Sequence, residues 1–201
     1  MYWCKNIFLF PPHGRGAAGC AMAGRGFAIF TLFVISFAAC KPDIKETGAT
    51  VKYFDLKAYF KADLARLSKI PQPILKSVTH NGVTESKKVK IDDWTKELSL
   101  FSESDINKPA WRDSYNVQQT DHTLIYMAKE DEDDLKTREI LINKKTDGSV
   151  KYIKIFNYKT NKLYTTKETL TYIPDSIYKI EKTQYVRLLG INKYVIVGRL
   201  N

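Results

Sequence analysis

The spacing of apolar residues predicts two helices in the first half of the folded region. Apolar side chains recur at intervals of three and four along residues 53–67, namely Tyr53, Leu56, Phe60, Leu64 and Leu67, which is the pattern of one helix face. Pro71 and Pro73 follow and end this helix. A shorter stripe of Trp94, Leu98 and Phe101 comes directly after Asp92 and Asp93. Either aspartate can cap a second helix there.

Strand-like patterns occupy most of the remaining chain. The Asn81-Gly82 pair is a strong signal for a tight hairpin between residues 74–79 and 83–91. After Trp111 the chain reads as strands at residues 116–128, 135–143, 150–158, 162–173, 176–189 and 194–200. Turn residues separate several of them, as at Asp147-Gly148, Thr160-Asn161 and Gly190-Ile191-Asn192. Such short connections predict an antiparallel meander.

Together these elements predict the α+β class, with residues 51–201 as a single domain. In residues 176–189 the apolar Tyr178, Ile180, Val186 and Leu188 alternate with the polar Glu181, Thr183 and Arg187. One sheet face is therefore expected to meet water. The amphipathic helix at residues 53–67 is expected to pack on the other face, and the second short helix completes the domain.

Composition narrows the class of protein but not its activity. The chain has 201 residues, of which 44% are hydrophobic and 27% are charged, as in ordinary soluble globular proteins. Its net charge is +10, yet the lysines are scattered. Without a basic run interleaved with aromatics, solvation explains them better than a nucleic-acid partner.

The N-terminal segment has the features of a signal peptide. Residues 26–39 form an apolar run of about 14 residues, preceded by Arg25, which is shorter than the roughly 20 residues of a membrane-spanning helix. The run ends in Phe37-Ala38-Ala39-Cys40. This sequence resembles the lipobox of bacterial lipoproteins, although Phe37 stands where leucine is usual. A buried helix, an uncleaved anchor and an ordinary secretory peptide are the alternatives.

The resemblance implies how the chain is processed and anchored. A signal peptidase would cut between Ala39 and Cys40, and the Cys40 thiol would carry a diacylglyceryl group with a further acyl chain such as palmitate on its amine. Several acyl chains together give stable membrane attachment. Residues 1–39 are then leader and signal peptide, with Met22 as the expected true start, and residues 40–50 are the lipidated cysteine and a flexible tether.

The residues after Cys40 bear on which membrane holds the protein. In the proteobacterial pathway an acidic residue directly after the cysteine retains a lipoprotein in the inner membrane, and this chain has Lys41 there. We therefore expect a cell-envelope location, in the outer membrane and facing the periplasm. A surface-export signal of some Bacteroidota is matched only in part by the segment Lys41-Pro42-Asp43-Ile44-Lys45-Glu46. The composition, rich in lysine, tyrosine and asparagine, also vaguely resembles that of Bacteroidota lipoproteins.

No reactive constellation stands out in the mature region. His80 and His122 are its only histidines, and no cysteine follows Cys40, so a zinc site is not expected. We expect His80 in a turn and His122 on a strand face. The acidic run at residues 130–134 lacks the spacing of a calcium loop and is read as a solvated hairpin loop. Ser176-Ile177-Tyr178-Lys179 has the Ser-x-x-Lys spacing of penicillin-binding enzymes but opens a strand instead of a helix.

The sequence therefore favours a non-enzymatic envelope lipoprotein, without catalytic residues, metal or cofactor, that binds or scaffolds another component. One alternative is a periplasmic carrier, because the 12 tyrosines suit a concave sheet face that binds an apolar ligand. A second alternative is a hydrolase with an unrecognised carboxylate site. A cavity between helix and sheet would favour the carrier, and a cleft with paired carboxylates would favour the hydrolase.

Overall fold

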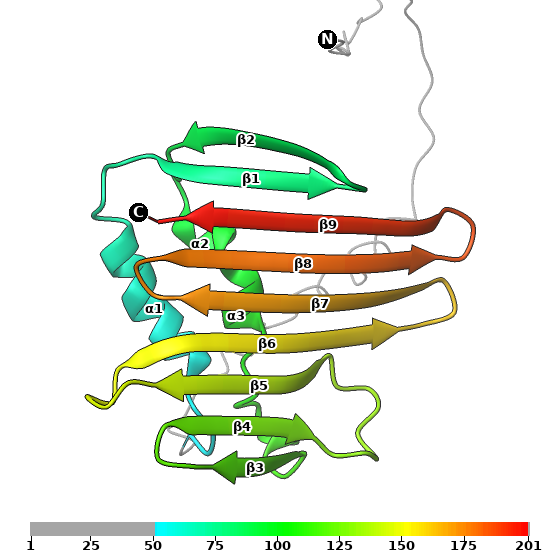
Figure 1. The fold of residues 1–201 in the computed structure, drawn as a ribbon. Coiled ribbons are helices and arrows are strands. Elements are labelled where there is room, and N and C mark those ends of the chain that lie inside the picture. The colour runs from blue at the N-terminus through cyan, green and yellow to red at the C-terminus, as the bar shows by residue number, and fades with distance from the viewer. Residues whose placement is uncertain (1–50, 201) are drawn as a thin grey trace, which may run out of the picture. The chain divides into compact units, whose positions relative to one another are not determined.

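The computed structural model describes residues 51–200, so the predicted leader, Cys40 and the tether lie outside the described residues. The described chain is mainly β, with nine strands in one antiparallel sheet of order β2-β1-β9-β8-β7-β6-β5-β4-β3 (Figure 1). The strands are β1 (Ile74–His80), β2 (Val83–Val89), β3 (Tyr115–Gln119), β4 (Thr123–Ala128), β5 (Thr137–Lys144), β6 (Val150–Thr160), β7 (Tyr164–Ile173), β8 (Ile177–Val186) and β9 (Gly190–Arg199). The helices are α1 (Leu56–Leu67), α2 (Trp94–Glu97), α3 (Ser99–Glu103) and a 3-10 turn, η1 (Pro109–Trp111).

The predicted meander is confirmed, since every strand from β3 to β8 pairs with the next one along the chain. The β1–β2 hairpin was also predicted, but its place was not. It joins the sheet beside the last strand, with Leu75 opposite Arg199 and His80 opposite Tyr194. The N-terminal hairpin therefore extends the C-terminal end of the meander (Figure 1).

Two predicted turns have the expected backbone. Asn81 and Gly82 both have positive φ, 48° and 91°, as the tight turn of a two-residue hairpin requires. Gly148 also has a positive φ of 81°. There the Lys145 amide and the Ser149 carbonyl close the turn with a 2.8 Å hydrogen bond.

Three element predictions were wrong. Residues 116–128 form two strands, β3 and β4, because Thr120 closes a turn on Thr123 through its backbone and its side chain. The second helix is broken at Leu98 into α2 and α3. The last turn lies at residues 187–189, where the Leu189 amide donates to the Val186 carbonyl, and Gly190 already begins β9.

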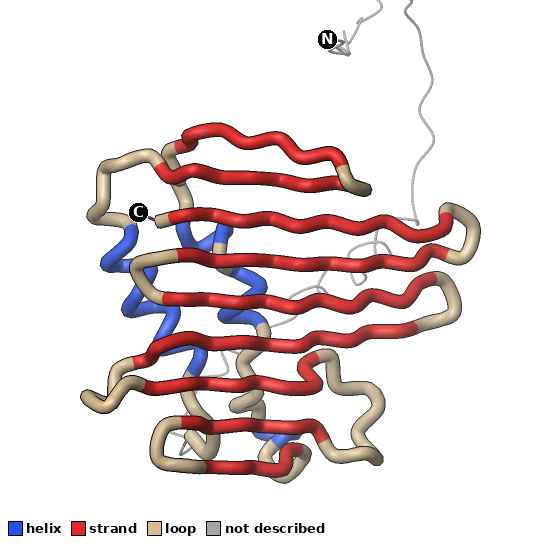
Figure 2. The backbone as a smooth tube through the Cα atoms, in the orientation of Figure 1, coloured by secondary structure: helices blue, strands red, loops and turns tan. Residues whose placement is uncertain are grey.

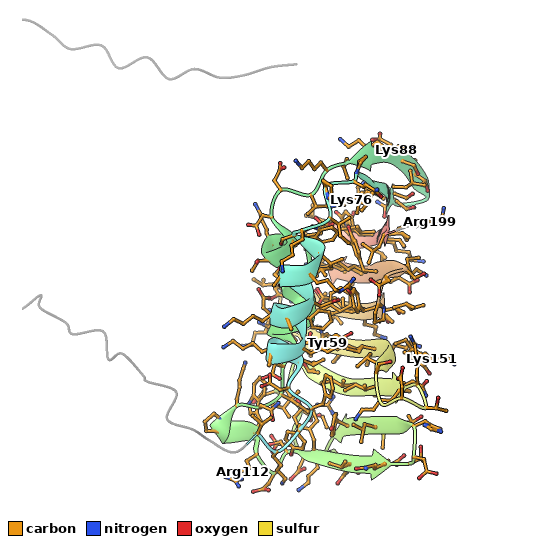
Figure 3. All side chains as sticks on the ribbon, turned by 90° about the vertical axis from the view of Figure 1, so that its left-hand side faces the viewer. Tyr59, Lys76, Lys88, Arg112, Lys151 and Arg199 are labelled. Carbon is orange, nitrogen blue, oxygen red and sulfur yellow. The ribbon has the colours of Figure 1, made fainter. Side chains whose placement is uncertain are left out.

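The three α-helices form one layer on a single face of the sheet, and the opposite face carries side chains alone (Figures 2 and 3). Between the layers, the buried ring of Phe60 on α1 meets Tyr172 on β7 and Phe101 on α3 at centroid distances of 5.1 and 5.3 Å. Such aromatic contacts stabilise the core by more than the burial of apolar area alone. No helix in the described residues is long and apolar enough to cross a membrane.

Polar contacts fix where α1 begins and how it joins the sheet. The Asp55 carboxylate accepts a 2.7 Å hydrogen bond from the Ala58 amide, which satisfies a free donor in the first turn. Further along the helix, Asp63 accepts from the hydroxyl of the buried Tyr172 on β7. This second contact links the helix layer to the middle of the sheet.

Candidate binding pockets

The inward-facing side chains change from apolar to polar along the strands. One row across the sheet is apolar and consists of Ile140, Ile155, Leu170, Ile180 and Ile196. The next row is Thr137, Asn157, Glu168, Lys182 and Tyr194. The helices cover one end of the strands, and β6 to β9 run on past them (Figures 1 and 2). The polar row therefore lies where the helical cover ends.

At the centre of this row is the carboxylate of Glu168, which is almost fully buried at 4% exposure. Its Oε1 lies 3.2 Å from the Lys182 ammonium and its Oε2 lies 3.6 Å from that of Lys136. A buried carboxylate needs such partners, because burial of an unpaired charge is strongly unfavourable. The two lysine ammonium groups carry more positive charge than the single carboxylate can neutralise, so this site is electropositive.

Beside Glu168 lies Asn157, which is 1% exposed. Its Nδ2 donates to the Ser104 hydroxyl at 3.0 Å and to Glu168 Oε2 at 3.5 Å. Its Oδ1 accepts no hydrogen bond from any described residue. Buried polar atoms almost always have partners, so this oxygen is an unpaired acceptor in the wall of the site.

These residues line a pocket of about 210 Å³, the lysine–glutamate pocket. Its lining consists of Lys136, Asn157, Tyr158, Lys159, Tyr164, Thr166, Glu168, Lys182 and Gln184. Drug-sized ligands usually occupy ~300–1,000 Å³, so this pocket suits a smaller molecule. Its chemistry favours a polar ligand with an anionic group near the lysines and a hydrogen-bond donor near Asn157.

A second hollow, the strand–helix groove, lies where the segment with α2 and α3 meets β1, β8 and β9, and it measures about 420 Å³. It is lined by Lys76, Lys90, Ile91, Asp92, Asp93, Lys96, Glu97, Ser99, Leu100, Ile180 and Ile196. Glu97 pairs with Lys76 at 2.6 Å and accepts from the Tyr178 hydroxyl. Burial, and then this hydrogen bond to Glu97, raises the pKa of Tyr178.

The histidines and the Ser-x-x-Lys segment that the sequence brought forward line neither hollow. His80 ends β1 and stacks on Tyr194 at 4.5 Å, so its expected place in a turn was wrong. His122 was expected on a strand face and instead lies in the β3–β4 turn. Lys179 pairs with Glu181 at 2.8 Å, and Ser176 precedes β8.

The acidic run at residues 130–134 is the loop between β4 and β5, as expected. Within it, Glu132 accepts a 2.6 Å hydrogen bond from the Ser114 hydroxyl. This contact gives Glu132 a structural role in holding the loop. Among residues 51–200, no group of three or more His, Cys, Asp and Glu side chains is arranged to hold a metal ion.

Sequence reasoning missed the residues of the lysine–glutamate pocket. A signal was present in β7, where Thr166 and Glu168 occupy the same alternating positions as the apolar Leu170 and Tyr172. Polar residues at inward strand positions indicate either a buried network or a site. The pairing of β6, β7 and β8 that brings Asn157, Glu168 and Lys182 together is a tertiary property.

Comparisons with known proteins do not assign the chain to a family. No protein-family model matches the chain, and no curated protein matches it.

Proposed function

We propose that the chain is a membrane-anchored envelope lipoprotein whose folded part, assigned to the α+β class, binds another component without converting it. The anchor is inferred from the lipobox-like sequence ending at Cys40. The binding role rests on the lysine–glutamate pocket. We place its ligand among small polar molecules that carry an anionic group and a hydrogen-bond donor.

One observation carries this proposal, namely the buried Oδ1 of Asn157 without a partner among the described residues. An unpaired buried acceptor costs about 1–3 kcal/mol, and a ligand that donates to it removes this cost. The excess positive charge of Lys136 and Lys182 over Glu168 supplies attraction for an anionic group on the same ligand.

Thermal unfolding with a panel of probes tests the pocket. The probes are acetate, inorganic phosphate, glycine, glucose and glucuronate, each at the same concentration and ionic strength. We expect glucuronate to raise the melting temperature most, because it joins a carboxylate to neutral hydroxyl donors without the ammonium charge of glycine, which Lys136 and Lys182 would repel. A ligand at 100 times its Kd stabilises by about 2.7 kcal/mol. Asn157→Ala and Lys182→Gln are expected to lose this shift.

Lys151→Gln is the matched control, because Lys151 is an exposed lysine on the same strand as Asn157 and lies outside the pocket lining. Its ligand-induced shift should equal that of the unsubstituted chain. The pocket proposal fails if no probe stabilises the unsubstituted protein, or if the shift persists in both pocket variants.

The strand–helix groove favours carriage of an apolar ligand as a second candidate function. Its volume of about 420 Å³ is within the usual range of ligand sites. Ile91, Leu100, Ile180 and Ile196 give it apolar walls, while its three lysines are balanced by Asp92, Asp93 and Glu97. A fluorescent fatty acid added to the same panel distinguishes this function, since Ile196→Glu should abolish its binding and leave the glucuronate shift unchanged.

The hydrolase alternative has less support. Asp93 and Glu97 both line the groove, yet each already has a structural partner. Asp93 caps α2 by accepting from the Lys96 amide at 3.0 Å, and Glu97 is engaged by Lys76 and Tyr178. These contacts favour a structural role for both carboxylates over a pair that acts on a substrate.

The anchoring proposal predicts that Cys40→Ser abolishes incorporation of a fatty-acid probe in the bacterial host and leaves an uncleaved or soluble precursor. The physical reason is that the thiol is the only acceptor for the diacylglyceryl group at the lipobox. Metabolic labelling and membrane fractionation measure the effect. The unsubstituted protein should fractionate with the outer membrane and resist proteinase added to intact cells, and equal labelling of variant and parent would contradict the assignment.

A further inference from the structure

Two neighbouring hairpin ends carry leucines that face water. Leu188 and Leu189 lie in the β8–β9 turn and are 93% and 77% exposed, while Leu163 in the β6–β7 turn is 71% exposed. The Arg187 amide donates to the Leu163 carbonyl at 3.1 Å, which ties the two turns together. Turns normally carry polar residues, so three exposed leucines at one place require an explanation.

The apolar surface continues onto the strands behind these turns. Ile191 at the start of β9 lies directly opposite Tyr185 at the end of β8, and the two are 60% and 49% exposed. We call Leu163, Tyr185, Leu188, Leu189 and Ile191 the apolar tip. In Figure 1 the β6–β7 and β8–β9 connections project further than the other hairpins at this end of the sheet.

Positive charge surrounds the apolar tip. Residues 159–167 and 182–194 contain no Asp or Glu. The exposed cationic side chains within them are Lys159, Lys162, Lys167, Arg187 and Lys193. The acidic run at residues 130–134 lies in the β4–β5 connection, which ends short of the tip in Figure 1.

We propose that the apolar tip inserts into the surface of an anionic lipid bilayer. A projecting pair of turns has a convex shape that a fluid surface can accommodate, and its leucines gain by leaving water. The flanking cations would meet lipid phosphates, each contributing about 1 kcal/mol near an anionic surface. The absence of acidic residues from both segments favours this partner over a protein surface of mixed charge. This contact does not depend on lipidation of Cys40 or on a ligand in either hollow.

Site-specific fluorescence tests the proposal in the full chain. Because residues 26–39 are apolar and can bind vesicles by themselves, overall vesicle binding is not a sufficient readout. Leu188→Trp is mixed with vesicles of phosphatidylglycerol and phosphatidylcholine, and the unsubstituted chain is subtracted to remove the native tryptophans. We expect a blue shift of the added tryptophan and loss of its fluorescence when the lipids carry brominated acyl chains.

Val117→Trp is the matched control, since Val117 is an exposed apolar residue, 49% exposed, on the edge strand β3 away from the tip. It should show neither the blue shift nor the quenching. Arg187→Glu in the Leu188→Trp chain should reduce the quenching, as should 1 M NaCl, where the screening length falls to about 3 Å. Equal quenching at positions 188 and 117, or no quenching at position 188, overturns the proposal. A blue shift of the tryptophan at position 188 in the absence of vesicles also overturns it and assigns the apolar tip to a protein contact.

Discussion

Above about pH 10 we expect the protein to lose its fold in one cooperative step, driven by the ionisation of buried and partly buried tyrosines. Burial is the largest cause of a raised pKa at all of them, namely Tyr59, Tyr115, Tyr126, Tyr172 and Tyr178. At Tyr172 and Tyr178, hydrogen bonds to Asp63 and Glu97 raise the pKa further. In each case the folded protein holds the neutral phenol.

The sign and the size of the effect follow from proton linkage. A tyrosine whose folded pKa exceeds its unfolded value of about 10 contributes full stability below pH 10 and loses it as the pH rises towards the folded pKa. In that window each such tyrosine lowers the unfolding free energy by about 1.4 kcal/mol per pH unit. Several such tyrosines acting together make the unfolding free energy fall steeply with pH, against a stability of only about 5–15 kcal/mol for a typical domain.

Circular dichroism and tyrosinate absorbance, recorded together against pH, measure this transition. Tyr115→Phe is the matched variant, because the Tyr115 hydroxyl donates to the Thr137 carbonyl at 2.8 Å but to no carboxylate. Losing that bond should cost about 1 kcal/mol at pH 7, and the slope of stability against pH should fall by about 1.4 kcal/mol per unit. The account is contradicted if the full tyrosinate signal develops while the circular dichroism stays native.

The strands were largely predictable because their period-2 patterns and turn residues are local signals. Residues 150–158 and 162–173 were recognised in this way and correspond closely to β6 and β7. Errors arose where local and tertiary signals differ. Leu188 continues the apolar alternation of β8 in the sequence, yet it occupies an exposed turn. Alternation alone cannot locate the end of a strand, because the strand ends where its hydrogen-bonded pairing with the neighbouring strands ends.

The binding pockets were not predictable for a related reason. Asn157, Glu168 and Lys182 are separated by more than ten residues each and become neighbours only through the register of β6, β7 and β8. The groove requires in addition that the β1–β2 hairpin pair with β9, which brings Lys76 to Glu97. Neither arrangement has a motif of fixed spacing. What the sequence can supply is the presence of polar residues at inward strand positions.

The pairing of β8 with β9 also makes Gly198 a position where we expect a single methyl group to destabilise the protein by about 3 kcal/mol. Gly198 lies directly opposite Tyr178, and a Cβ built on it would overlap the tyrosine ring. The ring cannot simply turn aside, because it is fully buried, packs edge-on against Trp94 at 6.5 Å and donates to Glu97.

A double-mutant cycle in urea separates this clash from a general intolerance of the strand. Gly198→Ala alone should show the full loss of unfolding free energy, whereas in a Tyr178→Val background the same change should cost little, since the ring that it meets has been removed. The difference between the two costs is the coupling energy, expected at about 2–3 kcal/mol for residues in direct contact. Equal costs in both backgrounds would show that the tyrosine ring is not what excludes a side chain at Gly198. A large coupling would instead show why β9 has a glycine at position 198. The Tyr178 ring, which donates to Glu97 in the groove, occupies the space that a side chain would need.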